Sequence, residues 1–277
     1  MLSDYITSTR RLLHDVNANF YTNAQLTDYI NEARNRTVGD TGCLRLLQTP
    51  VFQAGTENYV FGGLTGVSII NGGSGYTSGT WTTSGGGGSG GAGTYTAATV
   101  NGVSGVITSI LVTSQGSGYT STPTITFSNP GVGGNGTIGY INANTLDVLN
   151  NTIIWGNFRI QLVYMAFTEL SAKLRMWTSW QQRPVAFSIY GQQSMFIGPN
   201  PDLNYSAELD TVILPTVLVN LTDVDQIAYP FTAAVPYYAA RLAKLQEQSF
   251  GEAEMYMTQY TKRAIDAINS TYTRRLP

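Results

Sequence analysis

The chain has 277 residues, of which 15 are Lys or Arg, 17 are Asp or Glu and one is His, so its net charge is -2 and its pI is about 5.4. This charge balance excludes a strongly basic surface that would bind nucleic acid through its phosphates. With one Cys and one His, the chain cannot form an intrachain disulfide, and a Cys-based metal site or a catalytic triad is not expected. A charged fraction of 12%, about half the usual ~25%, together with 17 Tyr, favours protein contacts, and we expect no enzyme activity, cofactor or metal.

The N-terminal residues predict a helix over 2–14, with Ser3 as its N-cap. Charged side chains in its first turns argue against a secretory signal peptide. The sequence has no run of ~18 apolar residues, so we expect no membrane span and folding in a cytoplasm.

A second helix is predicted from the capping box that Thr22 and Gln25 form, and Gly42 is expected to end it. Two short strands, at 49–52 and 58–61, are predicted to follow. The chain therefore begins with two packed helices that lead into β-structure.

Charge is absent from Asn58 to Leu146, whereas every charged residue lies on either side of this segment. Its Gly, Ser, Thr and β-branched residues favour strands and turns. We interpret residues 62–139 as an inserted all-β repeat module, the insert, within a host domain formed by residues 1–61 and 140–277.

An internal repeat supports this interpretation. Residues 69–78 and 111–121 share the phrase Gly-Ser-Gly-Tyr-Thr-Ser, in which a strand leads into a Gly-Ser-Gly turn that tolerates positive φ. The tyrosines of the two copies, Tyr76 and Tyr119, can fold back over their strands. Further strands are predicted at 106–112 and 123–127.

After the insert, alternating apolar and polar residues predict one half-buried strand over 153–162. A short helix is predicted over 167–177, then a hairpin over 185–197 and a strand over 205–214. These elements predict a modest β part in the host domain.

A long helix is predicted from Thr232 to Ile268, with an interruption near Gly251, and residues 270–277 are predicted to form an extended tail. The predicted fold class is α+β, with a helical-bundle core, a small antiparallel β part and an inserted all-β Gly-rich domain.

Motifs of enzyme chemistry are weak. The glycines of Gly131-x-Gly133-x-x-Gly136 precede a strand pattern, so no helix N-terminus is expected to hold a pyrophosphate. Asp223 and Asp225 are interpreted as a solvated turn, because the Glu that completes a calcium loop is missing. Glu208 and Asp210 remain a carboxylate pair that a cell-wall hydrolase could use.

Several short phrases, in the same order on both sides of the insert, resemble the head-to-tail adaptor (connector) proteins of tailed, especially short-tailed, bacteriophages. The resemblance covers essentially the whole host domain. The phrases that carry it are Leu26–Arg34, Asp40–Cys43, Val148–Asn150, Trp155–Asn157, Ala186–Gln192, Phe196–Asp202, Asp210–Pro215 and Tyr229–Thr232.

This resemblance implies a structural virion protein of the neck, assembled in the host cytoplasm as a ring of twelve copies beneath the portal protein. Such a ring binds the tail nozzle or tube protein below and encloses the DNA exit channel without sequence-specific binding. The C-terminal segment of such adaptors commonly reaches the portal, so Tyr272, Arg274, Arg275 and Leu276 are the expected portal contacts.

The insert departs from the compact adaptor pattern. We expect it to contact tail fibres, the capsid or neighbouring subunits through Tyr76, Trp81, Tyr95 and Tyr119. The alternative is a fibre or adhesin-like protein in which the same four aromatic residues bind host surface glycans. Long amphipathic helices favour the adaptor over the fibre.

Overall fold

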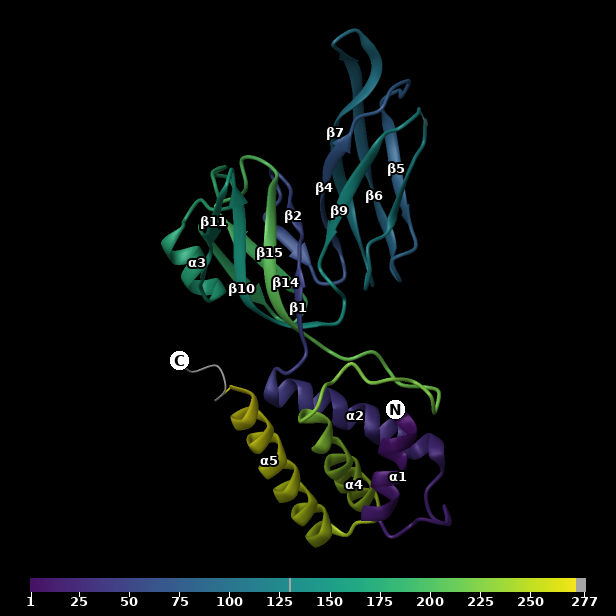
Figure 1. Cartoon of the computed structure of the whole chain (residues 1–277). Coiled ribbons are helices and arrows are strands. Elements are labelled where there is room, and N and C mark those ends of the chain that lie inside the picture. Colours follow the sequence, from purple (N-terminus) through teal and green to yellow (C-terminus); the bar gives the residue numbers. More distant parts are fainter. Residues whose placement is uncertain (130, 273–277) are drawn as a thin grey trace. The chain divides into compact units, whose positions relative to one another are not determined.

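The computed structural model describes residues 1–129 and 131–272 and divides the chain into two compact units (Figure 1). The helical unit combines Met1–Arg45 with Val212–Pro277, and the β unit is Leu46–Thr211. The two ends of the chain therefore fold together, and the middle folds as a separate body.

Within the helical unit, α4 lies between α1 and α5, and α2 packs across α1 and α4 (Figure 1). Proline in the first turn of α4 is compatible with a helix start, because that N–H has no partner inside the helix. The elements are α1 (Leu2–Leu12), α2 (Asn23–Thr41), the short 3₁₀ helix η1 (Phe231–Ala233), α4 (Val235–Gln246) and α5 (Phe250–Tyr272).

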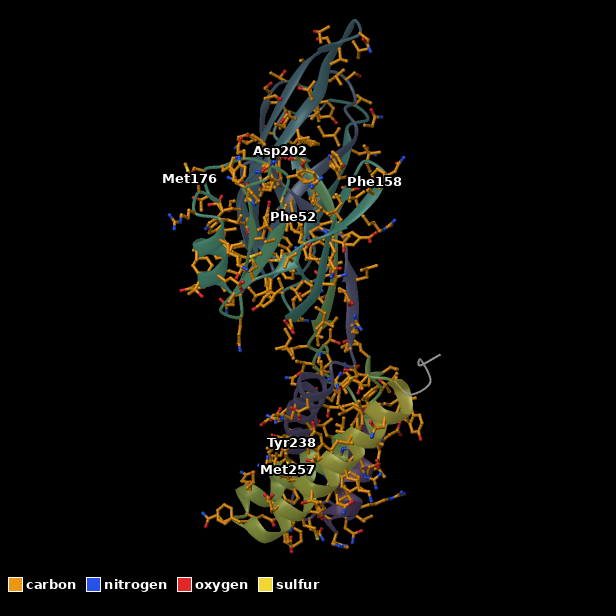
Figure 2. The ribbon with its side chains drawn as sticks, turned by 90° about the vertical axis from the view of Figure 1, so that its left-hand side faces the viewer. Phe52, Phe158, Met176, Asp202, Tyr238 and Met257 are labelled. Carbon is orange, nitrogen blue, oxygen red and sulfur yellow. The ribbon has the colours of Figure 1, made fainter. Side chains whose placement is uncertain are left out.

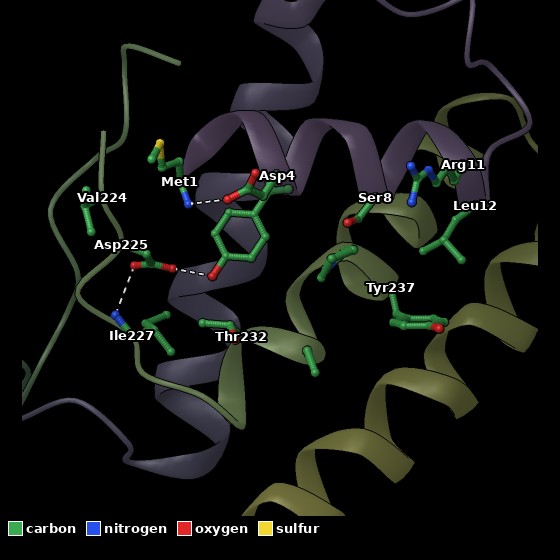
Figure 3. A pocket seen from close by; sticks show the side chains of 13 residues that line it. Met1, Asp4, Ser8, Arg11, Leu12, Val224, Asp225, Ile227, Thr232 and Tyr237 are labelled. Carbon is green, nitrogen blue, oxygen red and sulfur yellow. Dashed lines mark hydrogen bonds and ion pairs between the residues drawn. The ribbon is translucent and has the colours of Figure 1, made fainter. Parts of the chain in front are cut away.

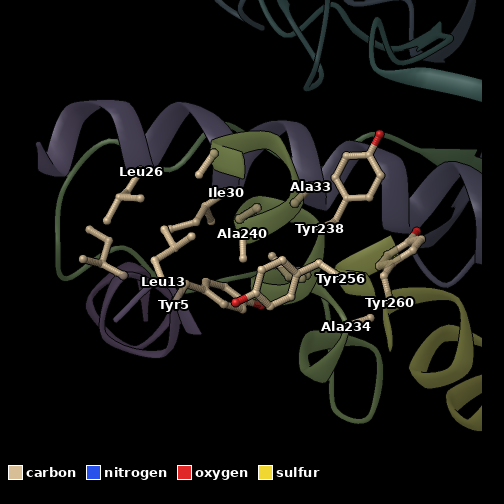
Figure 4. Packing of buried hydrophobic residues seen from close by; sticks show 14 of the residues in the cluster. Tyr5, Leu13, Leu26, Ile30, Ala33, Ala234, Tyr238, Ala240, Tyr256 and Tyr260 are labelled. Carbon is tan, nitrogen blue, oxygen red and sulfur yellow. The ribbon is translucent and has the colours of Figure 1, made fainter. Parts of the chain in front are cut away.

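Alanines, tyrosines, leucines and isoleucines form the core of this unit (Figure 4). Alanines such as Ala240 let α4 lie close to its neighbours, and the rings of Tyr238 and Tyr260 pack edge to face with their centroids 5.1 Å apart. The Tyr260 hydroxyl donates to Asp40 at 2.8 Å, which satisfies its polar end. Tyrosine thus supplies apolar area and a hydrogen bond together.

The helix ends agree in part with those predicted from the sequence. The capping box of Thr22 and Gln25 is present, and Gly42 ends α2 in the left-handed conformation, as predicted. Ser3 is not an N-cap, because α1 begins at Leu2 after Met1. The predicted long helix is two helices, and the chain turns at Gln248, whose φ is +62°, before Gly251.

The host strands of the β unit form two sheets around a core that includes Phe52, Tyr59 and Ile153. The first sheet has the order β1-β15-β10-β11 with β2 on β15, and the second has the order β12-β13-β14-β3. A short helix, α3 (Phe167–Lys173), precedes β13. The strands are β1 (Arg45–Gln48), β2 (Val51–Phe52), β3 (Asn58–Val60), β10 (Thr145–Trp155), β11 (Phe158–Gln161), β12 (Val163–Tyr164), β13 (Ala186–Tyr190), β14 (Ser194–Gly198) and β15 (Tyr205–Ile213).

The single strand predicted over 153–162 is wrong, because this segment forms the antiparallel hairpin of β10 and β11. Gly156, with φ +60°, makes the turn, and Trp155 pairs with Phe158 across it. The turn reverses the chain in the middle of the alternation. Phe158, an apolar residue of the strand predicted to be half-buried, is exposed (Figure 2).

The insert also consists of two sheets, β4-β9 and β7-β6-β5-β8, with an aromatic and aliphatic core between them. The long hairpin β6–β7 extends from this core (Figure 1). Its strands are β4 (Leu64–Asn71), β5 (Gly79–Ser84), β6 (Ser89–Val100), β7 (Val103–Ser117), β8 (Thr124–Phe127) and β9 (Asn135–Tyr140).

The two repeat copies share positive φ values at their glycines, although Gly116 of the second copy lies within strand β7 and not in the predicted turn. Gly73 and Gly116 have φ values of +61° and +62°, and Gly75 and Gly118 have values of +75° and +81°. An L-residue with a side chain rarely adopts these φ values, so the glycines give the two copies the same local backbone conformation.

Hydrogen bonds join the insert to the host strands. The Gln53 side chain bonds both backbone groups of Val112, and the Gln115 side chain bonds the Asn58 carbonyl and the Val60 N–H. The predicted insert, residues 62–139, therefore belongs with the host strands to one compact unit.

The predicted fold class is wrong in its emphasis on a helical-bundle core with a small β part. Strands account for 37% of the chain and helices for 27%, so the protein is a β-rich α+β structure. Host strands as short as two residues, such as Val51–Phe52 and Val163–Tyr164, leave little period-two signal, whereas the helices have clear apolar stripes.

Candidate protein-interaction site

A segment without regular secondary structure, residues 214–230, runs from β15 to η1 along the helical unit; we call it the strap. Its backbone bonds the beginning of α1, where Leu2 and Ser3 donate their N–H groups to the carbonyls of Asp223 and Leu221. The Asn31 side chain on α2 both donates to and accepts from the backbone of Leu218, at 2.9 Å each. The strap is thus attached to two helices.

A buried ion pair provides the central anchor. Arg34 of α2 donates from Nε and Nη2 to one carboxylate oxygen of Asp225, at 3.1 and 2.6 Å, and its Nη1 donates to the Thr216 carbonyl at 2.8 Å. The side chains of Arg34 and Asp225 are 1% and 6% exposed. A buried charge pair of this kind requires hydrogen bonds to its remaining atoms.

The second oxygen of Asp225 completes the anchor. It accepts the Tyr5 hydroxyl of α1 at 2.5 Å, and the first oxygen also accepts the N–H of Ile227 at 3.1 Å. Burial, followed by the hydrogen bond to Asp225, raises the pKa of Tyr5 well above its ordinary value, so the phenol remains a donor. One carboxylate therefore ties α1, α2 and the strap together.

Although it is fixed in this way, the strap exposes apolar side chains. Valine side chains at 217, 219 and 224 are 68%, 71% and 75% exposed, Leu221 is 49% exposed and Tyr229 is 85% exposed. Scattered exposed apolar residues are normal, but a group of five on one anchored segment is typical of a protein-binding surface.

Beside the strap lies a groove of about 590 Å³ (Figure 3). Side chains of α1, including Asp4 and Arg11, line one wall, and Val224 and Asp225 of the strap lie at one end. Tyr237 of α4 lies toward the other end, where the Arg263 guanidinium stacks on its ring at 4.2 Å. The groove combines apolar walls with accessible charges.

A second surface of the helical unit lies on α5. Its inner face, including Tyr256 and Tyr260, is buried against the core, whereas Met255 and Ile265 are 56% and 50% exposed. A shallow depression of about 460 Å³ runs along Glu254, Thr258, Lys262 and Ile265. The helical unit thus has two separate surfaces suited to contacts.

The β unit exposes apolar residues at the β10–β11 turn. Trp155 and Phe158 are 49% and 69% exposed, and the Arg183 guanidinium lies 5.0 Å from the Trp155 ring centroid. Leu203, 60% exposed, lines the adjacent pocket with Trp155 and Arg183. Aromatic residues with an Arg are typical of interface centres.

The four aromatic residues predicted to contact partners through the insert do not lie on its surface. Tyr76, Trp81, Tyr95 and Tyr119 are all buried in the core of the insert. The Trp81 indole N–H donates to backbone carbonyls at 3.2 Å, and Tyr76 and Tyr95 pack edge to face with Phe127. The prediction of surface contacts is wrong here, because a charge-free module uses its large aromatic residues to form its core.

The predicted portal contacts lie at the end of the described chain. Tyr272 is the last residue of α5, so residues 270–272 of the predicted tail are helical. Arg274, Arg275 and Leu276 lie outside the described residues.

The carboxylate pairs have structural partners. Glu208 accepts from Arg159 at 2.9 and 3.0 Å, and this hydrogen bond lowers the pKa of Glu208, whereas a general acid needs a raised pKa. Asp223 accepts the N–H groups of Val219 and Asn220, each at 2.8 Å. In residues 1–129 and 131–272, no group of three or more His, Cys, Asp or Glu side chains is arranged to hold a metal.

Sequence reasoning missed Asp225, which was interpreted as part of a solvated turn. The signal available was the spacing of Asn31 and Arg34 on one face of α2, because polar residues there need buried partners. Nothing in the local sequence identifies a partner some 190 residues away.

Comparison of the chain with protein-family models and with curated protein sequences finds no match. Among the described helices, none is both long and apolar enough to cross a membrane.

Proposed function

We propose that the chain is a structural protein of a bacteriophage virion, which forms a ring beneath the portal protein and joins the head to the tail. In this proposal the ring is a dodecamer, binds the tail nozzle or tube protein below and lines the DNA exit channel. The proposal rests on the resemblance of the host domain to phage adaptors and on surfaces suited to assembly.

The observation that carries the proposal furthest is the anchored strap. Fixing a segment through the buried Arg34–Asp225 pair while exposing five apolar side chains is costly unless a partner covers them. A fixed surface also loses little conformational entropy on binding, which favours assembly. The strap thus supports a role in protein contacts.

The charge of the chain fits an enclosing ring. A net charge of -2 per copy gives no strong attraction to phosphates, so DNA can move through the channel without being retained. The insert is one candidate contact with tail fibres or the capsid, through surface residues other than its four buried aromatic residues.

The two alternative functions, a fibre or adhesin-like protein and a cell-wall hydrolase, each require residues that are unsuited to the role. The fibre or adhesin-like protein required Tyr76, Trp81, Tyr95 and Tyr119 as a glycan platform, and these side chains are buried. A hydrolase acting through Glu208 lacks a carboxyl group with a raised pKa at that position.

A direct test is size-exclusion chromatography of the chain with the portal protein encoded by the same genome, followed by electron microscopy of the complex. We expect a ring of the chain on one end of the portal. Deletion of residues 273–277 should weaken portal binding at least about tenfold, if Arg274, Arg275 and Leu276 supply one ion pair or hot spot. Failure of the intact chain to bind the portal would contradict the proposal.

A further inference from the structure

Two surfaces of the helical unit carry exposed charges of both signs. In the groove, Arg11 projects from α1 without an ion pair among the described residues, and Asp4 is 77% exposed although it accepts the Met1 amino group at 2.8 Å. Arg11 lies near Leu12 and Tyr237, so the groove offers a cation beside apolar walls (Figure 3).

The outer face of α5 carries charges in the same order along the chain, an acid followed by a base. Glu254 and Lys262 line its shallow depression, and neither forms an ion pair with another described residue. Thr258 and Ile265 lie along the same depression, so the face is partly apolar.

The two surfaces point in different directions within one copy. Arg263 contacts Tyr237 at the groove, whereas Ile265 belongs to the outer face of α5. Residues two apart on a helix are separated by about 200° around its axis, so the outer face of α5 points away from the groove. One copy therefore cannot close this contact on itself, and a second copy can.

The charges match when two helices run antiparallel. Asp4 and Arg11 are about 10 Å apart along α1, and Glu254 and Lys262 are about 12 Å apart along α5. Antiparallel docking places Arg11 beside Glu254 and Asp4 beside Lys262, whereas parallel docking places like charges together. The complementarity thus favours the α5 face of a second copy as the occupant of the groove, in the antiparallel direction.

We infer that the outer face of α5 of one copy docks antiparallel to α1 in the groove of the next copy, with Arg11 bound to Glu254 and Asp4 bound to Lys262. Because the groove and the α5 face are different surfaces, the contact is head-to-tail and generates a ring when the rotation closes. The inference rests on the proposed ring function and identifies the interface that forms the ring.

Charge reversal tests this interface. Arg11→Glu and Glu254→Arg should each weaken association between copies at least about tenfold, because each places like charges side by side. The double variant Arg11→Glu/Glu254→Arg should restore association. Asp28→Arg, on the exposed part of α2 outside the groove, is the matched control and should assemble like the wild type. Circular dichroism verifies that each variant is folded.

Disulfide trapping gives a second readout. In a Cys43→Ser background, the double variant Arg11→Cys/Glu254→Cys should form a ladder of cross-linked copies under oxidising conditions, because each copy contributes both ends of the contact. Either single cysteine variant should give no ladder beyond a dimer.

Sedimentation velocity of these variants, alone and with the portal protein, distinguishes a wrong interface from a wrong proposed function. Restored assembly in the reversed pair, together with the ladder, supports the inference. Wild-type assembly of both single reversals, or a double variant as weak as the singles, overturns the interface but leaves the ring intact. A wild-type chain that forms no oligomer in either condition overturns the proposed function as well.

Discussion

At the scale of single residues, Asp225 joins three elements through one side chain. Its two oxygens accept donors from α1, from α2 and from the strap itself. The Asp225 side chain is buried by these contacts, as are Leu218 and Ile227 of the same strap. The exposed apolar side chains thus lie on a segment that a buried charge pair and buried apolar residues hold in place.

Substitution of Asp225 by Asn should therefore be severe. The guanidinium of Arg34 would stay buried without a negative partner, and we expect a loss of about 3–5 kcal/mol in the free energy of unfolding of the helical unit. The matched control is Asp223→Asn, whose carboxylate is partly exposed and accepts two strap N–H groups, so the expected loss is much smaller than for Asp225→Asn. Urea unfolding followed by circular dichroism measures both, and equal losses would contradict the anchor.

Asp15 makes the stability of the helical unit depend on pH in the acid range. Burial alone would raise its pKa, but the N–H groups of Tyr21, Asn19 and Phe20, together with the Arg10 guanidinium, hold the pKa below its ordinary value. A group whose folded pKa is lowered stabilises the fold above its unfolded pKa of about 3.9, and this stability is lost as the pH falls through the folded pKa.

The variant Asp15→Asn should thus be less stable than the wild type at neutral pH and should lose less stability on acidification. Thermal midpoints measured from neutral pH down to about pH 3 compare the two slopes. Parallel slopes would show that Asp15 does not link folding to protons.

At the scale of elements, local signals predicted much of the structure. The capping box at Thr22 and the glycine at 42 defined α2, and the Gly-Ser-Gly phrases correctly predicted glycines with positive φ in the insert. Local patterns failed where partners are distant in sequence. The turn at Gly156 divided an apparently continuous strand, and the short host strands depend on pairing that alternation alone does not reveal.

The candidate site was less predictable than the fold. Low charge and many tyrosines led to the hypothesis of protein contacts, which stays a prediction, and they did not identify which aromatic residues would be exposed. Tyr76 and Trp81 are buried with leucine, isoleucine and valine side chains in the core of the insert, whereas the strap valines are exposed on a segment that is bonded to α1 and α2.

Two glycines of the β6–β7 hairpin allow a test of the insert at this scale. Both have positive φ, but a Cβ at Gly102 meets no atom within 4 Å, whereas a Cβ at Gly116 lies 2.4 Å from the Ser89 carbonyl oxygen. Gly102→Ala should cost about 1–2 kcal/mol from backbone strain alone.

Gly116→Ala should cost more than Gly102→Ala, because the backbone of the paired strand must also move. Proteolysis under native conditions, followed within residues 89–117, compares the stability of the hairpin in the two variants. Equal protection would mean that the close approach at Gly116 has no energetic consequence.

At the scale of the whole molecule, the chain divides its roles between two units. The helical unit holds the strap, the groove and the outer face of α5, which are the surfaces proposed to form a ring. The β unit contains the insert and the exposed Trp155–Phe158 turn, which are candidates for contacts with tail or capsid proteins.

Sedimentation velocity of the purified chain, alone and with the portal protein from the same genome, tests the central proposal most directly. The proposal predicts that the chain sediments with the portal as one large complex that saturates at equal copy number of the two proteins. A chain that ignores the portal and sediments by itself as a trimer would contradict the adaptor function and would favour a fibre-like protein.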